Sequence, residues 1–143
     1  MLHKEIQQRI AGEFRYAATK MQEATTADKK LFYFSITFGE VQRSLNWEWN
    51  TDLALIHMVT HQVHAQINAT MQVPPLMQTL PTDWATIFDK MTQDASDLAT
   101  YFEKAENEGS KEELYRILGH FAEIAYAVSG NGSYLYEKGA FKL

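Results

Sequence analysis

Three histidines within eight residues are the feature of this chain best suited to chemistry. His57, His61 and His64 are spaced i, i+4 and i+7. On a helix that turns by ~100° per residue, these three side chains share an arc of about 60°. Imidazoles grouped in this way are common ligands of zinc, nickel and iron. The spacing therefore predicts that this helix binds a divalent transition metal, Zn, Ni or Fe.

One helix rarely aims three ligands at a single ion, so we expect further ligands from other helices. Glu13 lies between Ile10 and Ala17 on an apolar stripe, and a carboxylate is seldom buried without a partner. His120 lies beside the apolar stripe of a later helix. Secondary candidates on other predicted helices are His3, Asp94 and Tyr101. The predicted metal ligands are therefore His57, His61, His64, His120 and Glu13.

The histidine arc flanks the apolar stripe of its own helix. That stripe consists of Ile56, Thr60, Val63 and Ile67. Positions beside a stripe meet a neighbouring helix, so the imidazoles are expected to face a partly buried cleft. The alternative is that they only hydrogen-bond neighbours or solvent. No specific motif decides between the two, because Met58 stands where a His-Glu-x-x-His sequence would place its base.

Helical periodicity runs through most of the chain and predicts the elements that must position these residues. Five helices are expected, over about 2–24, 28–49, 51–72, 82–108 and 110–128. The last would open with a capping box from Ser110 to Glu113. One-sided stripes and short links predict an all-α fold, an antiparallel four- to five-helix bundle that forms a single domain over residues 1–143.

Composition excludes several function classes. The net charge of −5 and the lack of a long basic run argue against nucleic acid as a partner. The chain has no cysteine, so disulfides, thiolate catalysis and cysteine-ligated zinc are excluded. No apolar stretch is long enough for a membrane helix, and the polar N-terminus does not resemble a signal peptide. A cytoplasmic protein without a membrane partner is the expectation.

Two segments resemble parts of the DinB/YfiT-like helical-bundle metalloproteins. Residues 52–57, Asp-Leu-Ala-Leu-Ile-His, look like the helix that carries that family's early histidine. Residues 116–120, Arg-Ile-Leu-Gly-His, look like the start of its late His-x-x-x-His helix, but Ile124 replaces the second histidine. The resemblance implies a divalent metal held by His57 or His61 together with His120, with one ligand lost. Either the site is rebuilt around the histidine arc, or only the bundle remains.

Three functions are compatible with these patterns. The first is a divalent-metal-binding bundle, a small metal-dependent hydrolase or transferase acting on an unidentified small molecule. The second is a non-catalytic interaction module or homodimer, because Phe32, Tyr33 and Ile36 lie off the main stripe of their helix. The third is a carrier that binds haem or another small ligand through a histidine of the bundle.

Overall fold

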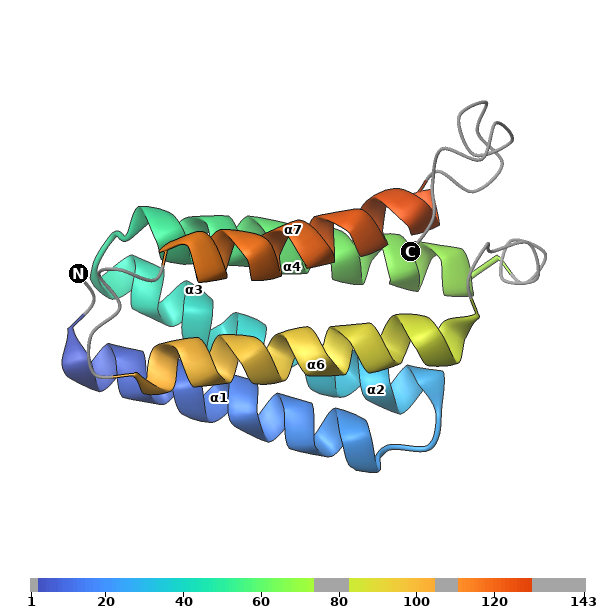
Figure 1. Cartoon of the computed structure of the whole chain (residues 1–143), viewed down its shortest axis with the longest axis horizontal. Coiled ribbons are helices and arrows are strands. Elements are labelled where there is room, and N and C mark those ends of the chain that lie inside the picture. Colours follow the sequence, from blue (N-terminus) through green and yellow to red (C-terminus); the bar gives the residue numbers. More distant parts are fainter. Residues whose placement is uncertain (1–2, 74–82, 105–110, 130–143) are drawn as a thin grey trace.

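The computed structural model describes residues 3–73, 83–104 and 111–129, and all regular structure in these ranges is helical (Figure 1). The all-α prediction is confirmed. The helices, with the figure's labels, are α1 (Lys4–Glu23), α2 (Ala27–Ser35), α3 (Thr37–Trp47), α4 (Thr51–Met71), α6 (Trp84–Glu103) and α7 (Lys111–Ser129). None of these helices is both long and apolar enough to cross a bilayer.

The helices pack around one apolar core. Figure 1 shows α1 alongside α6, and α4 alongside α7, while α2 and α3 cross the bundle between these pairs. Helices α6 and α7 also contact each other, which closes the bundle. The core is a single cluster, and its largest fully buried side chains include Phe14, Phe34, Phe88, Phe121, Met21 and Met91.

The helix predicted over 28–49 is interrupted, so that prediction was wrong in one respect. The chain turns at Ile36 and divides it into α2 and α3. The buried Thr37 hydroxyl donates to the Phe34 carbonyl at 3.0 Å, and the Ile36 amide donates to the Tyr33 carbonyl at 3.4 Å. Such local bonds compete with the i to i−4 ladder and bend helices. The bend places Phe38 in the first turn of α3.

Helices α4 and α6 begin at side-chain caps, at the positions that the sequence predicts. The Asn50 side chain accepts from the Leu53 amide at 2.9 Å at the start of α4. The Asp83 carboxylate accepts from the Thr86 amide at 2.7 Å at the start of α6. Each cap satisfies an amide that has no partner within the helix.

The end of α6 differs from the prediction. The helix stops at Glu103, five residues before the expected end at Glu108, and Lys104 has an extended conformation. The Gln7 side chain of α1 donates to the carbonyls of Phe102 and Lys104, which replaces the hydrogen bonds of a further turn. The expected capping box at Ser110 and the C-terminal tail lie outside the described residues.

Candidate functional site

The histidines of α4 form one cluster with an aromatic residue of α3. The ring centroids of His57 and His61 are 4.2 Å apart. Phe38 stacks on His61 with a centroid distance of 3.9 Å and meets His64 edge to face at 5.3 Å. The predicted arc therefore exists, and it faces α3. The bend after α2 positions the phenyl ring that holds these imidazoles in place.

The environment of the cluster favours neutral imidazoles. Burial lowers the pKa of His61, and the neighbouring His57 and His64 lower it further. Burial also lowers the pKa of His64. A neutral imidazole is the form that ligates a metal ion, because a protonated ring has no free lone pair.

One nitrogen of the cluster lacks a partner. His57 Nδ1 is buried and makes no hydrogen bond within the described part of the chain. A buried polar atom without a partner is energetically costly, and coordination to an ion would remove that cost. This orphaned nitrogen and its neutral neighbours are the features of the cluster to which an ion could bind.

The two partners expected from other helices do not complete the cluster. Glu13 is only partly buried on the flank of α1, whereas α4 packs against α2, α3 and α7. His120 of α7 points toward α6 instead. In the described ranges no three His, Cys, Asp or Glu side chains converge well enough to hold a metal. The structure therefore brings three of the five candidates together and places Glu13 and His120 elsewhere.

His120 forms a pair with Asp94 of α6. Its Nδ1 lies 3.0 Å from Asp94 Oδ1. Asp94 is buried, with 3% of its surface exposed, and its second oxygen has no partner among the described residues. Burial raises the pKa of Asp94, and the contact with His120 opposes that rise. The pair thus combines a desolvated carboxylate with an imidazole whose side chain is 44% exposed.

The Asp94–His120 pair lines a small cleft between α6 and α7 with a volume of about 250 Å³. Lys90 and Glu123 also line it. So does Arg116, which is bound to Glu113 and lies 3.4 Å from Asp97. This cleft contains an oriented imidazole, a buried carboxylate and cationic groups within one small volume.

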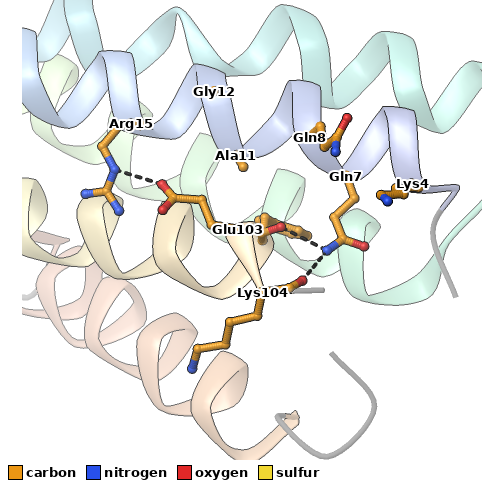
Figure 2. A pocket seen from close by; sticks show the side chains of 9 residues that line it. Lys4, Gln7, Gln8, Ala11, Gly12, Arg15, Glu103 and Lys104 are labelled. Carbon is orange, nitrogen blue, oxygen red and sulfur yellow. Dashed lines mark hydrogen bonds and ion pairs between the residues drawn. The ribbon is translucent and has the colours of Figure 1, made fainter. Parts of the chain in front are cut away.

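A larger hollow between α1 and α6 serves the fold. Figure 2 shows the Gln7 amide directed at the end of α6, and Arg15 bonded to Glu103. Arg15 also donates to Ser96 and Thr100. These polar groups hold two helices together, so this hollow of about 430 Å³ is not the preferred site.

No protein-family model, curated protein or solved structure matches the chain. The candidate sites therefore depend on geometry alone.

Sequence reasoning named Asp94 and His120 separately and did not pair them. The available signal was that each residue lies beside the stripe of its own helix. That signal becomes a pair only when α6 and α7 are known to be neighbours.

Proposed function

We propose that this protein is a divalent-metal-binding helical bundle, and that His57 and His61 hold the ion. The observation that carries the proposal is the 4.2 Å separation of the two rings beside the buried His57 Nδ1, which has no partner among the described residues. Both side chains lie one turn apart on α4, which is the spacing that directs two imidazoles to the same side.

The rest of the cluster supports the same role. Phe38 stacks on His61, so this imidazole loses less conformational freedom when it binds an ion. His64 contacts the same phenyl ring and would have to change its orientation before it could become a third ligand. The lowered pKa of His61 and of His64 keeps both rings neutral at pH 7.

Few protein ligands leave open positions on the ion for water and for a small substrate. When bound, the metal would make its water more acidic or polarise a substrate oxygen. The proposed activity is therefore that of a small metal-dependent hydrolase or transferase.

Calorimetric titration of the untagged chain with Zn²⁺ and Ni²⁺ tests the metal site. We expect one ion per chain, and loss of binding in the double variant His57→Asn/His61→Asn. The control is His3→Asn, which removes a distant histidine and keeps a side chain able to cap α1. Absence of binding in the unmodified chain, or equal binding in the double variant, would contradict the proposal.

Self-association through α2 is a second candidate. Phe32 is 60% exposed and meets the partly buried Tyr33 edge to face at 5.3 Å, so an aromatic ring of α2 stands in water. Light scattering over a range of concentrations should show a dimer that Phe32→Ser weakens. Tyr16→Ser, which removes an exposed aromatic ring from α1, should leave the dimer intact. A monomer at all concentrations argues against this function.

A further inference from the structure

We propose that the cleft between α6 and α7 is an acyl-transfer site in which His120 Nε2 is the nucleophile and Asp94 is its positioning residue. The substrate class is a small ester or thioester. This site is separate from the metal site proposed on α4, and it uses none of the same side chains.

The geometry fixes which ring nitrogen is available. His120 Nδ1 is directed at Asp94 Oδ1, 3.0 Å away on the neighbouring helix. A carboxylate in this position stabilises the tautomer that carries its proton on Nδ1. Nε2 then keeps its lone pair, and the side chain is exposed enough to be reached from the cleft.

Asp94 is an unusual residue to bury if its role is only structural. Only 3% of its surface is exposed, and its Oδ2 atom has no partner in the described ranges. An unpartnered carboxylate oxygen is unfavourable in the interior, and such groups are frequent where a proton must be held. Burial raises the pKa of this carboxyl, which makes it a better acceptor for the Nδ1 proton.

The charges that line the cleft favour a neutral electrophile. Arg116 already pairs with Glu113 and lies near Asp97, so its charge is largely compensated. The carboxylates of Asp94, Asp97 and Glu123 give the lining a negative excess that opposes a phosphate dianion. Lys90 lines the same cleft, has no ion pair among the described residues, and is the cation available to stabilise a carbonyl oxyanion. A volume of about 250 Å³ limits the substrate to a small molecule.

The proposed step transfers the acyl group to the ring and then to water. Nε2 attacks the carbonyl carbon, a C–N bond forms, and the bond from carbon to the alcohol or thiol oxygen or sulfur breaks. The ring keeps its Nδ1 proton, shared with Asp94, as an acyl-imidazolium, and the departing group takes a proton from water at the exposed side of the ring, leaves as the neutral alcohol or thiol and yields hydroxide. The hydroxide then adds to the acyl-imidazolium, the C–N bond breaks, and a carboxylic acid and the neutral imidazole are released.

Diethyl pyrocarbonate tests this nucleophile, because it acylates neutral imidazole with release of carbon dioxide and ethanol. The rate for each of the five histidines can be followed separately by peptide mass spectrometry. We expect His120 to react at least about tenfold faster than the more exposed His3, and p-nitrophenyl acetate to label the same residue. His120 reacting no faster than His3 would overturn the proposal, whether or not any variant folds.

Asp94→Asn separates nucleophilic activation from simple exposure. The amide keeps the shape of the side chain but removes the charge that selects the tautomer. We expect the His120 rate to fall about tenfold while the rate at His3 stays unchanged. Asp89→Asn, which removes an exposed carboxylate from the same helix, should leave the His120 rate unchanged. An unaltered His120 rate in Asp94→Asn, or an equal fall in Asp89→Asn, would contradict the role of Asp94.

Discussion

The imidazole of His120 and the carboxylate of Asp94 meet across the α6–α7 interface, with 3.0 Å between Nδ1 and Oδ1. The residues are 26 positions apart in the sequence. The histidine side chain is half exposed and the carboxylate is buried, so water reaches one end of the pair and not the other.

Replacing Asp94 with Asn should not weaken the fold at pH 7. Burial raises the pKa of this carboxyl, so its ionisation opposes folding above that raised pKa. The amide removes the ionisation and can still accept from His120. Urea denaturation at pH 7 should give a free energy of unfolding equal to or above that of the unmodified chain.

Urea denaturation at lower pH tests whether the pKa of Asp94 is raised in the folded state. Because the folded-state pKa is raised, the unmodified chain should gain stability relative to Asp94→Asn as the pH falls through that pKa. Asp89→Asn should not show this relative change. A loss of more than about 2 kcal/mol at pH 7 would mean that the charged pair stabilises the fold.

The histidine cluster should make the fold less stable in mild acid. The pKa values of His61 and His64 are lowered in the folded state from their usual value of 6.5. Their contribution is therefore complete above pH 6.5 and declines as the pH falls toward the folded-state values, because the unfolded chain takes up protons first. Urea midpoints measured from pH 7.5 to 5.5 should fall.

The variant His61→Gln should reduce this dependence on pH, whereas His3→Asn should leave it unchanged. Burial and two neighbouring imidazoles lower the pKa of His61, so its removal takes away that group's share of the acid response. A flat stability profile in the unmodified chain, or the same slope in both variants, would show that the cluster does not control the acid response.

Gln7 should prove essential to the junction of α1 and α6. Its amide nitrogen donates to the Phe102 carbonyl at 2.9 Å and also to the Lys104 carbonyl (Figure 2). Gln7→Ala should cost about 1–3 kcal/mol, because it removes the donor from buried carbonyl groups. Gln7→Glu should cost more at pH 7, since a carboxylate would face two carbonyl oxygens at the negative end of a helix.

The control for this pair is Gln8→Glu, an exposed residue that lines the same hollow. It introduces the same charge one position along α1 and should change the stability by no more than about 0.5 kcal/mol. Chemical denaturation of the three variants gives the comparison. If Gln7→Glu and Gln8→Glu lowered the stability equally, the added charge would explain the effect, and the two hydrogen bonds of Gln7 would not.

Phe14 should be among the most sensitive core positions. It is fully buried on α1, and its ring stacks on Phe102 of α6 with a centroid distance of 6.4 Å. Phe14→Ala should lower the free energy of unfolding by about 3–5 kcal/mol through lost burial and a cavity. Tyr16→Ala, at a position 51% exposed on the same helix, should change it by no more than about 0.5 kcal/mol.

Several parts of the fold follow from short stretches of sequence. The cap at Asn50 depends on a bond to a residue three positions away, so local chemistry was enough to place the start of α4. The shared side of His57 and His61 follows in the same way from the turn of one helix. The bend at Ile36 was missed because apolar stepping continues through it, whereas the local bonds of the Ile36 amide and the Thr37 hydroxyl interrupt the ladder.

The sequence by itself determined the helical class, the apolar stripes and the histidine arc, because each depends on the regular turn of a single helix. Tertiary structure decided that Gln7 ends α6, that Asp94 pairs with His120, and that α1, the helix of Glu13, packs mainly on α2, α3 and α6. Helical periodicity gives the direction in which a side chain points around the axis of its own helix. Which helix stands in that direction is decided by how all the stripes pack together into one core.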